Sequence, residues 1–262
     1  MAEFTSHSAG TPSWVDLFSP DLDGAKNFYG SLFGWELDDQ FDRDGNRIYS
    51  MARLDGKAVA GMGPMPPASE MPSFWNTYIA SDDIDATEAA VQANGGHVMM
   101  PSMQVMESGK MAVFADSTGA PFSVWQAQQH IGTELGNVSN TYSWNELMTR
   151  DVASAREFYS NVFGWQYITH EMPHGDYTVI EGGVNGGLGG MLQMPAEVPE
   201  AVPNHWGVYF TVDDLDASVA KVQELGGQVA MPAMELPGVG RVSTLLDSWG
   251  ASFILMQPNE QS

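Results

Sequence analysis

Two short segments of the sequence place a carboxylate between large apolar side chains. They are Trp14-Val-Asp16-Leu-Phe18 and Trp144-Asn-Glu146-Leu-Met148. Alternation along a β-strand puts every second side chain on one face, so each acid shares a face with its aromatic or methionine neighbours. Apolar surroundings raise the pKa of a carboxyl group, which suits it to acid–base chemistry or to ligand recognition. The structural alternative is that both acids bond the backbone at the rim of a sheet.

His205 is a third candidate for acid–base chemistry. It has the same strand parity as Gly207 and Tyr209, so it would look into the same kind of cavity as Glu146. The alternative is that His205 lies in a loop. The candidate catalytic residues are therefore Glu146, Asp16 and His205, with no role fixed for any of them.

Two further motifs resemble functional ones but are interpreted as loops. His170-Glu-Met-Pro-His174 fits the H-E-x-x-H spacing of zinc proteases, yet Pro173 would break the helix that this motif requires. The glycine-rich run 182–190 lacks the Lys-Ser/Thr ending of a phosphate loop, and no helix start follows it. The first motif is predicted to be a hairpin loop and the second a tight turn between strands.

Charge and composition exclude several classes of partner. The 262 residues include 33 acidic and 10 basic side chains, for a net charge of −23. Such a polyanion gains nothing from counterion release on nucleic acid, and anionic membranes repel it. The absence of cysteine removes disulfides and thiolate chemistry. With no signal-like start and no apolar run of spanning length, we expect a cytoplasmic monomer or homodimer whose partner is a small molecule.

An internal repeat organises the chain. At an offset of 130 residues, nine of the 22 positions in 14–35 are identical to those in 144–165. A second block, 72–126, aligns with 203–257 at an offset of 131. The sequence therefore predicts an N-terminal tail (1–11), a first domain (12–128), a linker (129–139) and a second domain (140–258).

Each copy contains two modules of the same kind. Alternation predicts a strand at Trp14–Phe18, and Asp21 and Gly34 are the expected N-cap and stop of a helix. Turn signals then separate three short strands. The same order of elements begins again with a strand at 75–81, followed by a helix at 83–94. The predicted fold class is α+β, with four strand–helix–strand–strand–strand modules.

The run D-x-x-x-A-x-x-F-Y-x-x-x-F-G-W, which starts at Asp21, resembles the first helix of the vicinal oxygen chelate superfamily. That superfamily includes glyoxalase I, extradiol dioxygenases and bleomycin-resistance proteins. The D-D-x-D…G-G and D-x-x-G-x-x-F stretches resemble its second module, and the resemblance covers 12–128 and 140–258. It implies that two modules form a cup-shaped, eight-stranded mixed sheet with the site inside. Which modules pair, within or across the copies, stays open.

The resemblance also implies positions for metal ligands. In this chain they hold side chains that are poor ligands: Trp14, Gly61, Asn76 and Ser123 in the first copy, and Trp144, Gly190, Gly207 and Ile254 in the second. Divalent transition metals need three or four well-placed nitrogen, oxygen or sulfur ligands. We therefore expect no cofactor and no metal in either cup. Asp16, Glu146 and His205 are the alternative set that could hold an ion.

The leading functional hypothesis is metal-independent binding of a bulky apolar or aromatic compound, including cationic ones. The runner-up is a lyase, isomerase or hydroxylase-like enzyme acting on a polyketide or small carbonyl compound. A protein-interaction scaffold with filled cups is the third. The expected ligand-binding residues are Trp14, Asp16, Phe18, Asn76, Tyr78, Trp125, Trp144, Glu146, Met148, His205 and Tyr209.

Overall fold

The computed structural model describes residues 2–65, 71–172, 175–183 and 186–259. The first copy consists of β2 (Pro12–Ser19), α1 (Leu22–Phe33), β3 (Glu36–Phe41), β4 (Arg47–Leu54) and β5 (Lys57–Pro64), followed by β6 (Phe74–Ala80), α2 (Ile84–Ala93), β7 (His97–Val105), β8 (Gly109–Ala115) and β9 (Pro121–Ala127). The second copy consists of β11 (Tyr142–Thr149), α3 (Val152–Phe163), β12 (Tyr167–His170), β13 (Tyr177–Ile180) and β14 (Gly189–Gln193), followed by β15 (His205–Thr211), α4 (Leu215–Glu224), β16 (Gln228–Leu236), β17 (Gly240–Leu246) and β18 (Ser252–Pro258).

Each copy forms its own eight-stranded mixed sheet. The strand orders are β3-β4-β5-β2-β6-β9-β8-β7 and β12-β13-β14-β11-β15-β18-β17-β16. The two modules of a copy meet at a central antiparallel pair, β2 with β6 or β11 with β15. The predicted α+β architecture is confirmed, and the open question of module pairing is answered: modules pair within each copy.

Local signals set the ends of the first helix in each copy. The Asp21 side chain accepts a hydrogen bond from the amide of Gly24, and Gly34 ends α1 with φ at 71°. Asp151 and Gly164 do the same for α3. Glycine adopts a positive φ without strain, whereas a residue with a Cβ atom is strained in that conformation. The helix start and stop predicted for the first copy are therefore confirmed.

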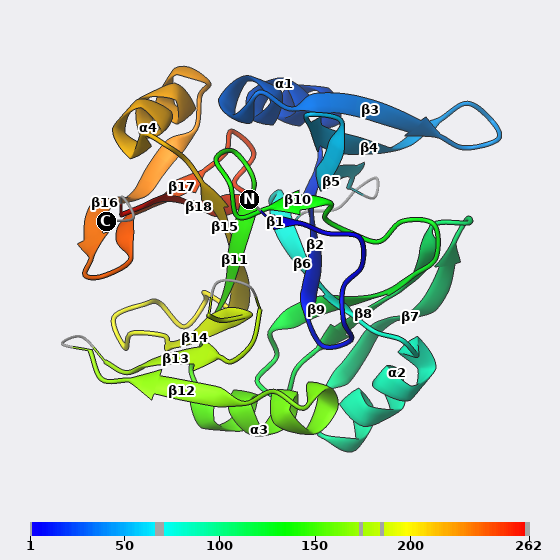
Figure 1. The fold of residues 1–262 in the computed structure, drawn as a ribbon, viewed down its shortest axis with the longest axis vertical. Coiled ribbons are helices and arrows are strands. Elements are labelled where there is room, and N and C mark those ends of the chain that lie inside the picture. Colours follow the sequence, from blue (N-terminus) through cyan, green and yellow to red (C-terminus); the bar gives the residue numbers. More distant parts are fainter. Residues whose placement is uncertain (1, 66–70, 173–174, 184–185, 260–262) are drawn as a thin grey trace.

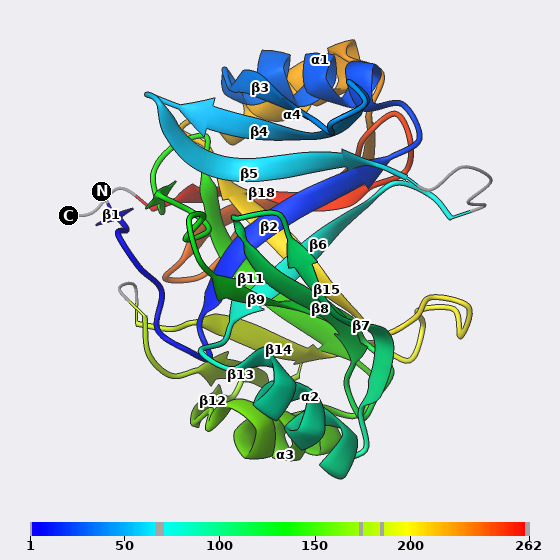
Figure 2. The same ribbon diagram turned by 90° about the vertical axis from the view of Figure 1, so that its right-hand side faces the viewer.

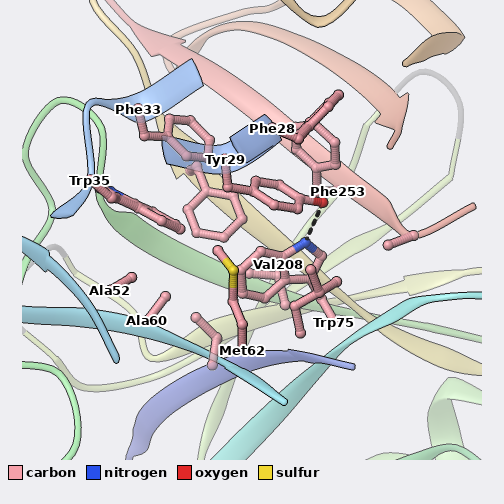
Figure 3. Packing of buried hydrophobic residues seen from close by; sticks show 14 of the residues in the cluster. Phe28, Tyr29, Phe33, Trp35, Ala52, Ala60, Met62, Trp75, Val208 and Phe253 are labelled. Carbon is pink, nitrogen blue, oxygen red and sulfur yellow. Dashed lines mark hydrogen bonds between the residues drawn. The ribbon is translucent and has the colours of Figure 1, made fainter. Parts of the chain in front are cut away.

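The helices of one copy lie beside those of the other. Helix α1 runs next to α4 and α2 next to α3, with the central strands of both sheets between the two helix pairs (Figures 1 and 2). In the α1–α4 half, the Tyr29 hydroxyl donates to Asp247 Oδ2 at 3.1 Å and accepts from Trp75 Nε1 at 3.0 Å. Figure 3 shows Tyr29 and Trp75 facing each other within this aromatic cluster. The hydrophobic core is thus shared between the copies.

Two short strands join the segments that flank the copies. Strand β1 (Ala2–Glu3) pairs with β10 (Leu135–Gly136), which ties the N-terminal segment to the stretch between the copies. Of the H-E-x-x-H run, His170 ends β12, while Pro173 and His174 lie outside the described residues, as do residues 184–185 of the glycine-rich run. No helix among the described residues is long and apolar enough to cross a membrane.

Candidate functional site

Each carboxylate lies on the face of its sheet that points away from the helices. We call this face the first cup in the first copy and the second cup in the second copy. In the first cup, Asp16 Oδ2 accepts hydrogen bonds from the hydroxyls of Tyr49 at 3.1 Å and Tyr78 at 3.0 Å. Asn76 Nδ2 lies 3.4 Å from Asp16 Oδ1 and donates to Ser123 Oγ at 2.7 Å. The register of β2 with β6 places Asn76 directly opposite Asp16. The alternation of β2 therefore brings Asp16 into a cluster of neutral donors.

A missing side chain makes room for one of these donors. Gly61 on β5 lies opposite Asp16, and a Cβ atom at Gly61 would overlap the Tyr49 hydroxyl. The Tyr49 hydroxyl is also fixed by Trp14, whose Nε1 donates to it at 3.0 Å. Tyr49 reaches the carboxylate from β4 across the narrow backbone of β5. Glycine is required here for close approach, not for turn geometry.

The first carboxyl group is strongly desolvated. Asp16 is 2% exposed, and burial raises its pKa to about 7 even though hydrogen bonds from Tyr78, Tyr49 and Asn76 act in the opposite direction. The same burial, together with the nearby Asp16 charge, raises the pKa values of Tyr49 and Tyr78 well above their ordinary value. Near neutral pH, Asp16 thus exchanges a proton while both phenols stay protonated.

The second cup repeats this arrangement with Glu146. Trp144 Nε1 donates to the Tyr177 hydroxyl at 3.0 Å, and the hydroxyls of Tyr177 and Tyr209 lie near Glu146 and favour its charged form. Gly190 lies opposite Glu146, and a Cβ atom there would overlap the Tyr177 hydroxyl. Burial raises the pKa of Glu146, and the two tyrosine hydroxyls oppose that rise. Each copy therefore carries one Trp–Tyr–carboxylate–Tyr cluster.

The two cups differ in how they are covered. In the first, Trp14, Asp16 and Tyr78 are each no more than 3% exposed. The ring of His130, which follows β9, packs edge-on against Trp14 at 4.6 Å, and its carbonyl accepts from Trp125 Nε1 at 2.8 Å. Burial lowers the pKa of His130 to about 4, so it covers the Trp14 end of the cup as a neutral ring.

In the second cup the corresponding side chains keep contact with solvent. Trp144 and Glu146 are half-buried, and Tyr209 is 8% exposed, whereas Tyr49 and Tyr177 are both half-buried and show no difference. The second cup is therefore the more accessible of the two.

The remaining candidates lie farther along the same faces. Phe18 stacks on Phe74 at 5.5 Å, and Trp125 packs edge-on against Tyr78 at 6.4 Å. Met148 lies opposite His205, two residues along β11 from Glu146. The His205 ring contacts the carbonyl of Pro203 at 2.8 Å through Nδ1. The structure thus gathers each carboxylate with its Trp and Tyr partners, whereas His205 bonds to the turn that precedes β15.

Residues 11–124 and 139–255 each match the profile of the Glyoxalase/Bleomycin resistance protein/Dioxygenase superfamily. The chain belongs to this superfamily. The protein named "Putative glyoxylase CFP32" of Mycobacterium tuberculosis is 44% identical over 264 residues, covering 100% of both chains. Anthracycline biosynthesis protein DnrV of Streptomyces peucetius is 35% identical, over 98% of this chain and 96% of that protein.

Solved structures of the superfamily share the fold at low identity. The Mn(II)-bound glyoxalase from Novosphingobium aromaticivorans superposes with a TM-score of 0.66 at 15% identity, over 95% of this chain and 82% of that one. The 2,3-dioxygenase LapB from Pseudomonas sp. KL28 gives a TM-score of 0.64 at 12% identity, over 96% and 93%. At these identities the likeness concerns the fold alone.

The residues of the two clusters do not fit a metal ion of the kind bound in the glyoxalase from Novosphingobium. Each cluster supplies one carboxylate, and the tyrosine hydroxyls around it are donors aimed at the oxygens that an ion would need. The indole N–H of Trp14 or Trp144 is a donor only. Among the residues that the structure describes, no three His, Cys, Asp or Glu side chains are grouped to hold an ion. The clusters are built to hydrogen-bond a carboxyl group.

Sequence reasoning missed Tyr49, Tyr177 and His130. The two tyrosines are not at the repeat offset of 130 or 131 residues, because the hairpins before them differ in length. The available signal was the pair Gly61 and Gly190, each opposite the acid in the next strand. Glycine inside a strand indicates that another group approaches closely. His130 falls within the predicted linker, so its contact with the first cup had no signal in the sequence.

The close approach at Gly61 leads to a direct test. Gly61→Ala should lower the free energy of unfolding by about 1–3 kcal/mol, because its methyl group overlaps the Tyr49 hydroxyl. Urea denaturation followed by tryptophan fluorescence measures the change. In a protein that already carries Tyr49→Ala, Gly61→Ala should lower the free energy of unfolding by much less. Equal costs in both backgrounds would mean that Tyr49 does not fill this space.

Proposed function

We propose that this protein binds a planar, largely apolar small molecule in its second cup, beside Glu146, without a metal ion. The observation that carries the proposal is a half-buried glutamate that lies beside Tyr177 and Tyr209 in aromatic surroundings. Ligand pockets typically combine apolar and aromatic walls with a few fixed polar groups that orient the ligand. The net charge of −23 would favour the approach of cationic members of this class.

The second cup is preferred to the first because of its exposure. Asp16 is 2% exposed and already accepts three side-chain donors, and His130 packs over Trp14. A ligand would have to displace this segment to reach Asp16. Glu146 and Trp144 are half-buried, so the second cup is the one whose carboxylate residue has contact with solvent. The first cup then serves as a structural counterpart of the second.

Relatives over the whole length support a small-molecule role. DnrV is named for anthracycline biosynthesis, and anthracyclines are planar polycyclic compounds. CFP32 is named as a glyoxylase. These names belong to the relatives, and for this chain they support a planar or carbonyl-bearing ligand. The half-buried aromatic residues Trp144 and Tyr177 offer flat surfaces for such a ligand.

A second candidate function is acid–base catalysis on the same ligand class, such as a lyase, isomerase or hydroxylase-like reaction. The specific observation is the raised pKa of Glu146 between two tyrosine hydroxyls. A carboxyl group with a raised pKa can take a proton from one atom of a ligand and return it to another. Under this alternative, Glu146→Gln abolishes turnover and leaves ligand binding largely intact.

Equilibrium dialysis against planar polycyclic compounds, with and without a cationic substituent, tests the proposed function. We expect at least one compound to bind with a Kd below about 100 µM, equivalent to about −5.5 kcal/mol. Binding should survive extensive treatment with a metal chelator. If every compound binds more weakly than this limit, or if chelation removes binding, the proposal is wrong.

A further inference from the structure

A cavity lies where the N-terminal segment, the stretch between the copies and the second copy meet. Its volume is about 280 Å³, close to the lower end of the range for small-molecule sites. The N-terminal segment leads from β1 along this side of the molecule to the start of β2 (Figure 2). The described residues that line the cavity include Phe4, His7, Thr11, Asn137, Tyr142 and Leu188. Residues predicted to be a tail and a linker therefore form much of its wall.

The cavity is distinct from the second cup, although the two are neighbours. Trp144 and Glu146 are not among the described residues that line it. Gly187 does line it, and a Cβ atom on Gly187 would come within 2.6 Å of Trp144 Cη2, so the indole ring lies against this glycine. Binding in the cavity therefore does not require contact with Glu146.

Hydrogen bonds hold the N-terminal wall of the cavity in place. Strand β1 pairs with β10 before the wall begins. The His7 ring then contacts the carbonyl of Thr133 at 2.8 Å through Nε2, and the carbonyl of Gly10 accepts from Trp165 Nε1 at 2.6 Å. A wall that is already ordered loses little conformational entropy when a ligand binds. The cavity is therefore a preformed site.

The polar groups of the wall are neutral, and several have no bonding partner. No Asp, Glu, Lys or Arg side chain is among the described residues that line the cavity, and burial lowers the pKa of His7, which keeps its ring uncharged near neutral pH. Within the described part of the chain, the side chains of Ser6 and Asn137 make no hydrogen bond. The hydroxyl of Thr133, which is 1% exposed, has no partner there either. Hydroxyl and amide groups both donate and accept, so they fit a neutral molecule that does the same.

Rings and an aliphatic side chain supply the apolar part of the wall. The Phe4 and His7 rings lie 5.0 Å apart between their centroids. Tyr142, whose hydroxyl accepts a hydrogen bond from Asn145, and Leu188 line the cavity as well. Ligand sites combine such apolar surfaces with a few polar groups that orient the ligand. This wall suits a small ring with apolar faces and hydroxyl groups at its edge.

We infer that this cavity is a second small-molecule site, which takes a neutral ring bearing several hydroxyl groups, such as a pyranoside. A charged ligand would be buried without an opposite charge among the described lining residues, which is costly. A purely apolar ligand would cover the hydroxyl of Ser6 and the amide of Asn137 without bonding them, which is also unfavourable. This site is independent of the proposed function of the second cup.

Three probes of similar size test the ligand class by isothermal titration calorimetry. They are methyl β-D-glucopyranoside, methyl tetrahydropyranyl ether, which lacks the hydroxyl groups, and methyl β-D-glucuronide, which carries a carboxylate. The glucoside should bind with a Kd below about 1 mM and at least about tenfold more tightly than either of the others. A weaker Kd, or equal binding of the ether or the glucuronide, overturns the inference. Neither result bears on planar compounds in the second cup.

A matched pair of variants tests the location of the site. Asn137 and Asn140 both have a positive φ, at 58° and 64°, so glycine fits either position without strain. Asn137→Gly removes an amide from the wall and should weaken glucoside binding about fivefold. Asn140→Gly makes the same change outside the described lining and should leave binding unaltered.

Two further variants separate this site from the second cup. Phe4→Ala removes a ring from the wall and should weaken glucoside binding about fivefold, which provides the test if Asn137→Gly does not fold. Glu146→Gln should leave glucoside binding unchanged, because Glu146 does not line the cavity among the described residues. Far-UV circular dichroism verifies folding. Undiminished binding in folded Asn137→Gly and Phe4→Ala proteins, or lost binding in Glu146→Gln, would contradict the placement of the site.

Discussion

Replacing Glu146 by Gln should weaken binding of a planar ligand about tenfold or more, whereas Asp16→Asn should leave that binding unchanged. Hydrogen bonds to charged groups contribute about 1.5–3 kcal/mol, and Glu146 is more exposed than Asp16. Asp16 is 2% exposed beneath Trp14 and His130, so its hydrogen bonds stay within the protein. Isothermal titration calorimetry with the planar polycyclic compound that binds most tightly in equilibrium dialysis measures both affinities.

The two substitutions form a matched pair because each removes one carboxylate from the same kind of cluster. Loss of binding in Asp16→Asn with normal binding in Glu146→Gln would transfer the site to the first cup. It would also require the segment around His130 to move away from Trp14. Loss of turnover with retained binding in Glu146→Gln would instead support the acid–base alternative.

The buried Asp16 should make the stability of the whole protein depend on pH. The pKa of Asp16 is about 7 in the folded protein, above its ordinary value of 3.8, so the folded state binds the proton more tightly than the unfolded chain. This contribution to stability is therefore fully present below about pH 4 and is lost as the pH rises to about 7. Between pH 5 and pH 8 the loss should be on the order of 3 kcal/mol.

Asp16→Asn isolates this effect, since asparagine keeps a neutral side chain at every pH. Urea denaturation of both proteins at pH 5, 6, 7 and 8 gives the difference in free energy of unfolding. Relative to the Asp16→Asn variant, the unaltered protein should become less stable step by step from pH 5 to pH 7 and then level off. A difference that stays constant across this range would show that Asp16 does not bind a proton on folding.

Duplication followed by divergence accounts for the contrast between the cups. Both retain the Trp–Tyr–carboxylate–Tyr arrangement, including the glycines that admit Tyr49 and Tyr177. The first cup has a complete set of donors and a cover from the segment between the copies. The second has Gly207 and Ile254 where the first has Asn76 and Ser123. The first copy thus buries its carboxylate fully, while the second leaves its carboxylate residue half-buried.

The sequence alone determined the features that depend on neighbouring residues. The repeat offset, the α1 boundaries at Asp21 and Gly34, and the shared face of Trp14 and Asp16 all follow from local spacing. Strand alternation and helix capping involve residues within a few positions of one another, so a linear pattern contains them. The same patterns assign each carboxylate to a face without identifying its partners.

Only the tertiary structure decided what stands next to each carboxylate. Tyr49 reaches Asp16 from a strand two positions away in the sheet, and this contact depends on hairpin lengths and on Gly61 in between. The pairing of modules within each copy and the placement of His130 over Trp14 likewise join segments far apart in the chain. Such contacts depend on how whole sheets and connecting segments pack, because many registers satisfy the same alternation of apolar and polar residues.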